Sequence, residues 1–343
     1  MNLKQRFQEA FPNAFFLEKD ITTVSHYLRQ QGWLQKNESL ILLEKPGEGN
    51  MNFVLRATTN QRSFILKQAR PWVEKFPQID APIGRVKVEA QFFQILKTVD
   101  SISHYTPKYL GFDNNNFILA TEDLGKGADY SFLYRKDSLL EELEVESLAN
   151  YLSDLHKVDI PDDFPSNMAM RELNHEHIFN FPYLEENGFN LNEVQEGLQA
   201  AAMPYKTDAL LKKVILECGI IYLSKGTHLL HGDFYPGSWL KIMDGLKVID
   251  PEFGFVGPVE FDLGVLIAHL IMAEQSAATI QTALQQYQQP KDFNSGLLAQ
   301  FVGIEILRRL IGIAQLPLSL DLTAKKRLME QAATWIRSEK LTI

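Results

Sequence analysis

Cysteine is nearly absent from this sequence, since Cys218 is the only one among 343 residues. A single cysteine excludes an intramolecular disulfide and a cysteine-based zinc site, and it is typical of a reducing compartment, so we expect a cytoplasmic protein. Cys218 stands in the apolar stretch VILECGI, where we interpret it as a small buried hydrophobic side chain.

Long apolar runs and excess positive charge are also missing. No stretch reaches about 18 uncharged apolar residues, and the N-terminal MNLKQRFQEAF has no continuous apolar core, so neither a membrane span nor a signal peptide is expected. The formal net charge of -9 argues against nucleic acid and membrane surfaces as partners. A homodimer is left open.

The order of the expected elements indicates an α+β chain with two lobes. Strand patterns occur at 39–45, 52–58, 62–68 and 116–120, with one helix at 84–99. Helical spacing prevails after residue 138, notably at 138–158 and 261–275, although 228–250 has strand character. We therefore expect a β-rich lobe at 1–121, a joint at 122–125, and a larger, mainly helical lobe at 126–343.

A hairpin is expected within the stretch HLLHGDFYPGSWLKIMDGLKVIDPEF, residues 228–253. Asp244-Gly245 between two apolar runs is a strong two-residue turn signal. Pairing outward from that turn brings Ser238 beside Asp250, within roughly 5–8 Å. The loop before Ser238 contains Asp233, so three oxygen-bearing side chains are expected at one end of the hairpin.

This set of oxygen ligands predicts a magnesium site. Pro251 favours an extended conformation at Asp250, and Glu252, two residues later, can point to the same side. Mg²⁺ usually takes one or two carboxylates together with waters and substrate phosphates. Asp233 could accept a proton from an attacking hydroxyl or orient it. The alternative is that Asp233 and Asp250 only cap turns.

The segment GEGNMNFVLR, residues 47–56, joins two expected strands. A P-loop or a Rossmann glycine loop would run into a helix instead. A glycine-rich turn between strands can lie over phosphates, so Gly47, Gly49 and Asn50 are candidate nucleotide-binding residues. An ordinary hairpin turn is the alternative.

Lys67 and Glu89 form the second part of this expected nucleotide site. Glu89 shares a helical face with Phe92, Phe93 and Leu96, and a carboxylate on an apolar face needs a partner. Lys67, on the strand before the helix, is the natural candidate. A strand lysine paired with a helix glutamate holds phosphates in protein-kinase-like folds. Two unpaired surface residues are the alternative.

These motifs resemble a known family. HGDFYPGS, followed by IDPEF and FDLG, is similar to the aminoglycoside phosphotransferase superfamily, which has the two-lobed protein-kinase-like fold. Within it, the sequence looks most like the 5-methylthioribose kinases, through GEGNMNFVLR, ILKQARPWV, EDL and EILRRLIGIA. The resemblance extends over positions 47 to 314.

The resemblance implies a role for each matching residue. Asp233 would be the catalytic Asp, and ATP and Mg²⁺ would be the cofactors. The metal would be held by Asp250 and Glu252, with Ser238 where the superfamily usually has Asn. Lys67 would contact the nucleotide phosphates, and Glu122 to Leu124 would lie along the adenine. Arg308 and Arg309 match an arginine pair that serves the substrate in methylthioribose kinases.

Some positions depart from the family pattern or have a simpler interpretation. Tyr235 stands where both groups commonly carry His, Glu260 replaces a small residue, and IAQLPL after the arginine pair differs, so the substrate is in doubt. Adjacent helical side chains diverge by about 100°, so one arginine could face the cleft while the other pairs with Glu305.

Four further polar residues are interpreted as structural. Asp262 precedes an apolar helix and is a candidate N-cap, while the resemblance implies that it braces the catalytic loop. His231 more readily supports that loop than performs chemistry. His156 and His269 lie in apolar helices, and we expect both in the core.

Together these features predict in-line phosphoryl transfer from ATP to a hydroxyl of a small molecule, most simply a sugar. Only residues 251–261 separate Asp250 from the FDLG helix, which leaves little room for a peptide-docking segment. The alternatives are an aminoglycoside or amino-alcohol kinase of the choline and ethanolamine type, and an inactive nucleotide-binding module. Loss of Asp233, Lys67 or Asp250 would mark the inactive module, yet all three are present.

Overall fold

The computed structural model describes residues 2–47 and 51–343, so the predicted nucleotide-binding residues Gly49 and Asn50 lie outside the described part. The chain forms two compact units. Unit 1 comprises Met1–Gly127, Pro161–Met170 and Lys247–Gly254, and unit 2 comprises Ala128–Ile160, Arg171–Leu246 and Phe255–Ile343. Two segments of the expected second lobe, 161–170 and 247–254, are therefore counted with the β-rich unit.

Unit 1 is built around an antiparallel five-stranded sheet of order β1-β2-β3-β7-β6. Its elements are α1 (Leu3–Ala10), α2 (Ile21–Gln30), β1 (Leu40–Glu44), β2 (Phe53–Thr59), β3 (Ser63–Gln68), β4 (Trp72–Val73), β5 (Phe76–Asp80), α3 (Arg85–Leu96), α4 (Asp100–Ser103), β6 (Tyr109–Asp113), β7 (Ile118–Glu122) and η6 (Pro251–Phe253). The expected strands at 39–45, 52–58 and 62–68 and the expected helix at 84–99 are confirmed, with ends shifted by at most three residues.

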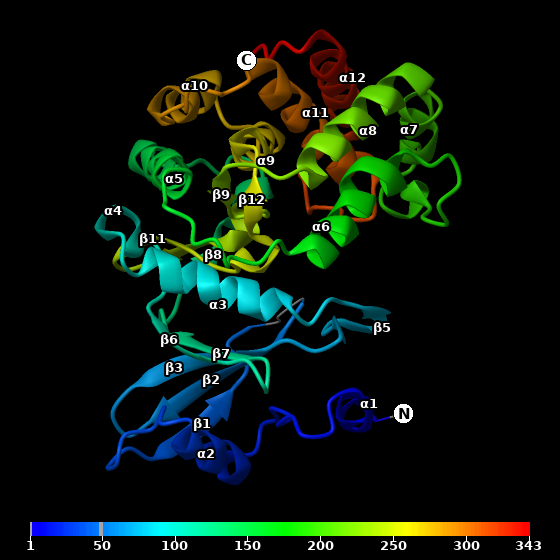
Figure 1. Cartoon of the computed structure of the whole chain (residues 1–343). Helices are drawn as coiled ribbons and strands as arrows, with labels where there is room; N and C mark the ends of the chain where they lie inside the picture. Colours follow the sequence, from blue (N-terminus) through cyan, green and yellow to red (C-terminus); the bar gives the residue numbers. More distant parts are fainter. Residues whose placement is uncertain (1, 48–50) are drawn as a thin grey trace. The chain divides into compact units, whose positions relative to one another are not determined.

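The two faces of this sheet have different neighbours (Figure 1). Side chains alternate along β2, so that Leu55 and Ala57 enter a buried apolar cluster with Leu66 of β3 and with Val24 and Leu28 of α2. Helix α3 lies on the other side of the sheet. Alternation along β3 therefore sends the residue after Leu66, which is Lys67, toward α3.

Unit 2 is mainly helical, as expected. Its elements are β8 (Ala128–Asp129), η1 (Tyr130–Tyr134), α5 (Glu142–Leu155), α6 (Met168–His175), the π-helical turn η2 (Glu176–Asn180), η3 (Phe181–Tyr183), η4 (Leu191–Glu193), α7 (Leu198–Lys206), α8 (Ala209–Leu223), β9 (His228–Leu230), η5 (Pro236–Ser238), β10 (Trp239–Ile242), β11 (Gly245–Val248), β12 (Phe255–Gly257), α9 (Val259–Met272), α10 (Ala277–Gln286), α11 (Ser295–Ile311) and α12 (Leu322–Ser338). Helix α6 begins in a unit 1 segment, and β11 ends in one.

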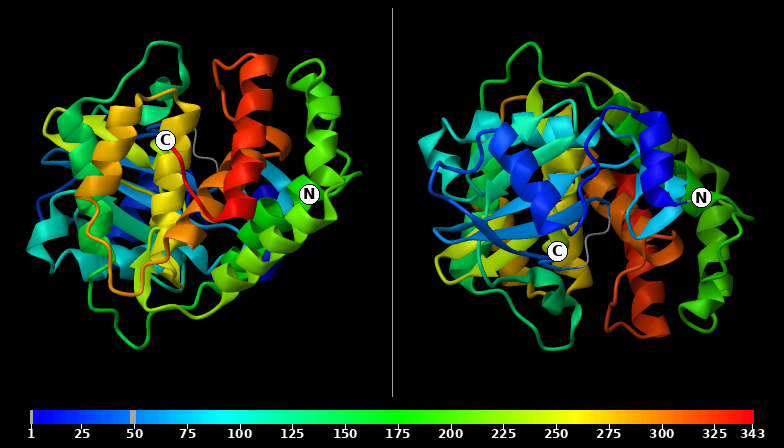
Figure 2. Two further views of the ribbon diagram at one scale, coloured as in Figure 1. Left: turned by 90° about the horizontal axis from the view of Figure 1, so that it is seen from above. Right: turned by 90° about the horizontal axis from the view of Figure 1, so that it is seen from below.

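The core of unit 2 is formed by α9, α11 and α12. Helices α11 and α12 lie side by side (Figures 1 and 2), and Gly303 permits their close approach, because a Cβ there would lie 2.5 Å from the Ala332 carbonyl oxygen. Every residue of α11 from Phe301 to Ile311 is buried. Charged side chains on this part of α11 must therefore have internal partners.

The predicted hairpin is present, but its turn is one residue earlier than expected. Strands β10 and β11 are neighbours in a sheet, and Met243 and Asp244, rather than Asp244 and Gly245, connect them. Gly245 opens β11 with a φ of +110°, a conformation that glycine adopts without a Cβ clash. The glycine signal was correct, although it marks the first strand residue rather than the turn.

Within residues 2–47 and 51–343, no helix combines the length and apolar character needed to cross a membrane.

Candidate active site

The predicted pair of Lys67 and Glu89 is present at the centre of unit 1. The Lys67 ammonium lies 2.7 Å from Glu89 Oε1 and also contacts Asp250 Oδ1. Lys67 and Glu89 are both buried, whereas the Asp250 side chain is 47% exposed. One lysine thus joins the strand β3, the helix α3 and the segment before η6.

Burial and charge oppose each other in this cluster. Burial alone would lower the pKa of Lys67, but the Asp250 and Glu89 carboxylates outweigh it and the net direction is upward. Burial raises the pKa of Glu89 to about 7, although Lys67 opposes this shift. Lys67 is therefore a permanent cation, available to a bound anion.

The backbone of Asp250 differs from the prediction. Asp250 has φ 62° and ψ 46°, which is left-handed rather than extended, so the expectation drawn from Pro251 is wrong. Proline disfavours the right-handed helical region of the preceding residue, but Asp tolerates the left-handed region better than most residues. The sharp turn starts η6 and leaves the Asp250 carboxylate beside Lys67.

Glu252 is buried in a network that the sequence did not reveal. Its Oε2 accepts a hydrogen bond of 2.8 Å from Asn52 Nδ2 and lies 3.1 Å from Arg85 Nε. Burial raises the pKa of Glu252, and Arg85 and Lys67 oppose that shift. Arg85 stands four residues before Glu89 and therefore on the same helical face, which is the signal that could have identified it.

The expected hinge residues lie at the end of β7. Glu122 Oε2 accepts a hydrogen bond from the Lys108 backbone N–H, and Leu124 is half-buried. Asp123, between these two residues, accepts two hydrogen bonds of 2.8 and 3.0 Å from Arg56 of β2, a partner that the sequence did not indicate. Gly47 is exposed in the bend after β1.

In unit 2, Asp262 braces the loop that carries Asp233. Its carboxylate accepts hydrogen bonds from the backbone N–H groups of His231 (2.6 Å) and Gly232 (3.0 Å). The N-cap of α9 is Pro258, so the N-cap interpretation of Asp262 is wrong, whereas the bracing contact is present. His231 is fully buried, and its Nδ1 accepts the Asp233 N–H at 3.3 Å, as expected of a supporting residue.

The same loop is closed by Ser238 and Tyr235. The Ser238 hydroxyl donates to the Asp233 carbonyl oxygen at 2.9 Å, and Ser238 N–H donates to the Tyr235 carbonyl at 2.8 Å. A Cβ at Gly237 would lie 2.4 Å from Tyr235 Cζ, so a larger residue there would displace the Tyr235 ring. The hydroxyl of Ser238 therefore supports the loop, and its role toward a metal stays a prediction.

Arg308 and Arg309 lie together on α11, near Asp233. Both pair with Glu305, which was the simpler interpretation of either arginine; Arg309 Nε lies 2.8 Å from Glu305 Oε1, and Arg308 Nε contacts Oε2. Their Nη2 atoms lie 4.0 Å (Arg308) and 3.7 Å (Arg309) from Asp233 Oδ1. One carboxylate thus aligns both guanidinium groups toward the predicted catalytic residue.

His269 continues this network into the core. Its Nε2 lies 2.9 Å from Glu305 Oε1, and its Nδ1 lies 2.7 Å from the Tyr134 hydroxyl. Burial lowers the pKa of His269 to about 4, although Glu305 opposes the shift, so the ring is neutral near pH 7. Glu305 can only accept, because burial would raise its pKa but Arg308 and Arg309 hold the pKa well below its usual range. Nε2 therefore carries the proton, and Nδ1 accepts from Tyr134.

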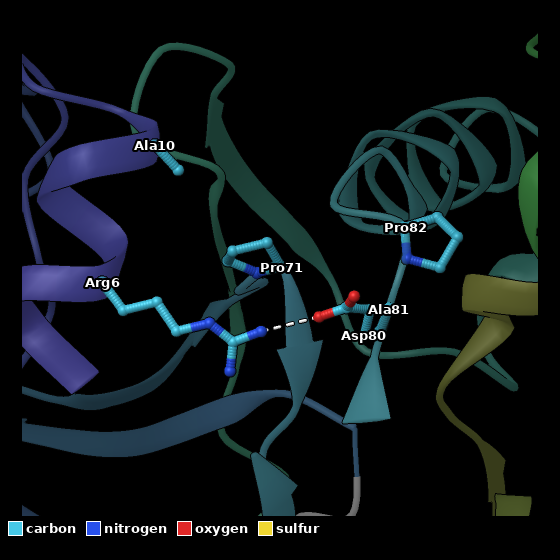
Figure 3. A pocket seen from close by; sticks show the side chains of 6 residues that line it. All are labelled: Arg6, Ala10, Pro71, Asp80, Ala81 and Pro82. Carbon is cyan, nitrogen blue, oxygen red and sulfur yellow. Dashed lines mark hydrogen bonds and ion pairs between the residues drawn. The ribbon is translucent and has the colours of Figure 1, made fainter. Parts of the chain in front are cut away.

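A hollow of about 490 Å³ lies elsewhere in unit 1 (Figure 3). An ion pair of 2.6 Å between Arg6 and Asp80 crosses it, and its other walls are small apolar residues and prolines. The Asp80 side chain is 85% exposed. The hollow contains none of the predicted site residues, and an exposed ion pair of this kind contributes little energy.

Comparison with solved structures defines the class of fold. The choline kinase LicA from Streptococcus pneumoniae superposes with a TM-score of 0.51, at 15% identity, over 92% of this chain and 98% of that one. The predicted α+β, protein-kinase-like fold is therefore confirmed. The profile of the phosphotransferase enzyme family matches residues 44–297. The chain belongs to this phosphotransferase family, as its motifs indicated.

Curated relatives carry a more specific name. A methylthioribose kinase of Exiguobacterium sibiricum is 27% identical over 255 residues, covering 68% of this chain and 61% of that protein. The chain thus spans about three fifths of the length of this relative. A methylthioribose kinase of Yersinia pestis is 26% identical over 346 residues, covering 84% of this chain and 83% of that protein. The resemblance to methylthioribose kinases in sequence is confirmed.

Proposed function

We propose that this chain is an ATP-dependent kinase that phosphorylates a hydroxyl of a small molecule, and that the acceptor is a sugar of the methylthioribose type. The observation that carries the proposal is the contact of Lys67 with both Glu89 and Asp250. A buried lysine held between a helix carboxylate and a half-exposed carboxylate suits the binding of phosphate groups beside a metal. The reducing environment expected from one cysteine favours a cytoplasmic enzyme.

Mg²⁺ would be held by Asp250 and Glu252. Across residues 2–47 and 51–343 there is no cluster of three or more His, Cys, Asp or Glu side chains that could hold a metal. Mg²⁺ needs only one or two protein carboxylates when nucleotide phosphates and waters complete its shell, so the two carboxylates fit. The ion would neutralise charge on the transferred phosphoryl group, while Lys67 binds the nucleotide phosphates and Glu122 to Leu124 line the adenine.

Asp233 would orient the acceptor hydroxyl and accept its proton. Hydrogen bonds to His231 and Asp262 fix the loop, which favours a defined position for this carboxylate. Arg308 and Arg309 would bind oxygen atoms of the acceptor. The hydroxyl oxygen attacks the γ-phosphorus, the bond from that phosphorus to the β,γ-bridging oxygen breaks, and ADP leaves.

An amino-alcohol or aminoglycoside kinase is the second candidate, because the structural neighbour is a choline kinase. The two buried arginines favour a neutral or anionic acceptor over a cationic one, since like charges repel. An inactive nucleotide-binding module is the candidate from another class, and the presence of Asp233, Lys67 and Asp250 argues against it.

A screen for ATP consumption tests the proposal directly. The purified chain is incubated with Mg²⁺, ATP and single compounds from three groups: sugars that include methylthioribose, amino alcohols, and aminoglycosides. We expect ADP release that depends on one sugar and is lost in Asp233→Asn. Turnover with only an amino alcohol or an aminoglycoside would favour the second candidate, and nucleotide binding without turnover on any compound would favour the inactive module.

A further inference from the structure

Arg85 forms five hydrogen bonds within the described part of unit 1, and no motif contains it. It is the first residue of α3 and is fully buried. Its guanidinium donates to four backbone carbonyls besides its side-chain partners: those of Met51, Arg70, Trp72 and Pro82, at 2.8 to 3.4 Å. Arg85 therefore ties Met51, which lies two residues before β2, to the start of α3.

Asn52 links Arg85 to Glu252. Asn52 Oδ1 accepts from Arg85 Nε at 3.0 Å, and Asn52 Nδ2 donates to Glu252 Oε2 at 2.8 Å. Only this orientation of the amide satisfies both partners, because a guanidinium only donates and a carboxylate only accepts. Arg85 Nε itself lies 3.1 Å from Glu252 Oε2. The three side chains close a triangle, and each of the three residues is at most 5% exposed.

The backbone of Glu252 is fixed from a second side. Asn167 Nδ2 donates to the carbonyl oxygens of Glu252 (2.9 Å) and Gly254 (3.0 Å). Both contacts of the Glu252 carboxylate described above are made by Oε2, and neither uses Oε1. Glu252 is thus bonded to Asn52, the residue directly before β2.

The charge of this network indicates a role in binding as well as in stability. Replacing a buried ion pair by apolar residues is often neutral or stabilising, so stability alone does not explain why Arg85 and Glu252 are buried together. When the carboxyl groups of Glu89, Asp250 and Glu252 are all ionised, they outnumber the cations Lys67 and Arg85 by one, so the linked cluster then carries one excess negative charge. A divalent cation reverses the sign of that charge and so favours the arrival of nucleotide phosphates.

We propose that Arg85 and Asn52 are positioning residues that couple Glu252 to the start of β2. Through this coupling, Mg²⁺ and the nucleotide phosphates strengthen each other's binding. This inference rests on the proposed function. Coupling of this kind is reciprocal and typically changes affinity by about 5- to 150-fold. Glu252 then contributes in two ways, through the metal and through Asn52.

The test removes the bridge but leaves the ion pair. In Asn52→Ala, Glu252 keeps Arg85 as a partner, whereas replacing Arg85 would release four backbone carbonyls and endanger folding. Calorimetry gives the Kd of a non-hydrolysable ATP analogue with and without Mg²⁺, and the ratio of the two values measures the coupling. We expect that ratio to fall at least about fivefold in Asn52→Ala, with little change in the Kd measured without Mg²⁺.

Thr59→Ala is the matched control, because Thr59 at the far end of β2 makes the same kind of contact. Its hydroxyl donates at 2.9 Å to the buried Glu38, which pairs with Arg62 at 2.9 Å. Thr59→Ala should melt earlier and keep the wild-type ratio. Should Asn52→Ala not fold, Asn52→Ser takes its place, since the serine hydroxyl ends one bond short of the amide atoms that reach Arg85 and Glu252.

The outcomes separate this inference from the proposed function. A wild-type ratio in the folded Asn52 variant overturns the coupling and leaves the kinase proposal intact. An equal fall of the Kd ratio in the Asn52 and Thr59 variants also overturns the coupling, because loss of any buried hydrogen bond at either end of β2 would then have the same effect. No effect of Mg²⁺ on nucleotide binding in the wild type would count against the proposed function itself.

Discussion

At the scale of single residues, Asp233 combines a fixed backbone with a charged neighbourhood. Asp262 holds the N–H groups of the two residues before it, and His231 holds its own N–H. The two guanidinium groups of α11 approach its Oδ1. A carboxylate in this position suits orientation of a hydroxyl as much as removal of its proton.

Asp233→Asn should reduce kcat by at least about 100-fold, the range of general-base contributions, and leave the Kd for ATP nearly unchanged. The amide retains the size of the side chain but cannot accept the proton. Steady-state kinetics and calorimetry measure the two effects. Turnover within a few-fold of wild type would remove Asp233 as the catalytic residue.

His269 makes the stability of unit 2 depend on pH. In the folded protein its pKa is about 4, below the ordinary value of 6.5, so the unfolded chain binds the proton first as the pH falls. The contribution of this group to stability is therefore complete above about pH 6.5 and is lost as the pH falls toward 4, by about 1.4 kcal/mol per pH unit.

His269→Gln should flatten this dependence. Glutamine can donate to Glu305 and accept from Tyr134 as the neutral ring does, but it does not titrate. Urea unfolding of both proteins at several pH values between 4 and 7 provides the measurement. Parallel curves for the variant and the wild type would show that protonation of His269 does not limit acid stability.

At the scale of elements, α11 presents two arginines through one glutamate. Arg308→Ala or Arg309→Ala should raise KM for the acceptor and leave the Kd for ATP unchanged. The expected loss is about 1–3 kcal/mol, the scale of one charged hydrogen-bonding partner. Glu305 keeps one guanidinium in either variant, so both should fold.

The two kinds of role for the arginines are distinguished by parallel measurements. Acceptor kinetics report on binding, and thermal melting reports on the pairing with Glu305. Variants that melt earlier but bind the acceptor normally would make the arginines structural. The proposal of a methylthioribose-type acceptor would then lose its main support on the substrate side.

Elements also differ in how well the sequence predicted them. Strands β2 and β3 and helix α3 follow from strict apolar periodicity, and the pairing of Lys67 with Glu89 follows from a carboxylate on an apolar face. The hairpin turn was displaced by one residue, because a glycine with positive φ can stand in the turn or directly after it. Local sequence patterns therefore predict that a helix or strand is present better than they predict the residues at which it begins and ends.

At the scale of the whole molecule, nucleotide binding should stabilise the fold by mass action. At a concentration of 100 times the Kd, a ligand that binds only the folded state adds about 2.7 kcal/mol. We expect Mg²⁺ with an ATP analogue to raise the melting temperature by several degrees, and Asp233→Asn to retain the full shift. Asp250→Ala should lose the part of the melting-temperature shift that depends on Mg²⁺, and Glu252→Ala should lose a smaller part of it.

Thermal melting with the analogue alone, with Mg²⁺ alone and with both isolates the contribution of the metal. The shift with Mg²⁺ alone should be small, because two carboxylates without phosphates bind Mg²⁺ weakly. If the Asp250 and Glu252 variants both respond to Mg²⁺ as the wild type does, neither residue is a metal ligand.

The sequence by itself determined the fold class, the two-part division into β-rich and helical regions, the family, and the residue types of the candidate site. Each of these follows from periodicity or from short motifs such as HGD and IDPEF, in which the informative residues are neighbours in the chain. The tertiary structure decided how those residues are held. Asn52 and Glu252 are 200 positions apart, and no local pattern predicts their hydrogen bond.

Contacts between distant segments also explain the other features that the sequence did not predict. Glu305 reaches His269 because α9 and α11 pack together, and Asp250 takes a left-handed conformation with Lys67 beside it. A buried charge needs a partner because it has lost its contact with water, and the partner comes from whichever element packs beside it. Sequence therefore supplied the candidate residues of the site, and packing between distant segments determined their geometry.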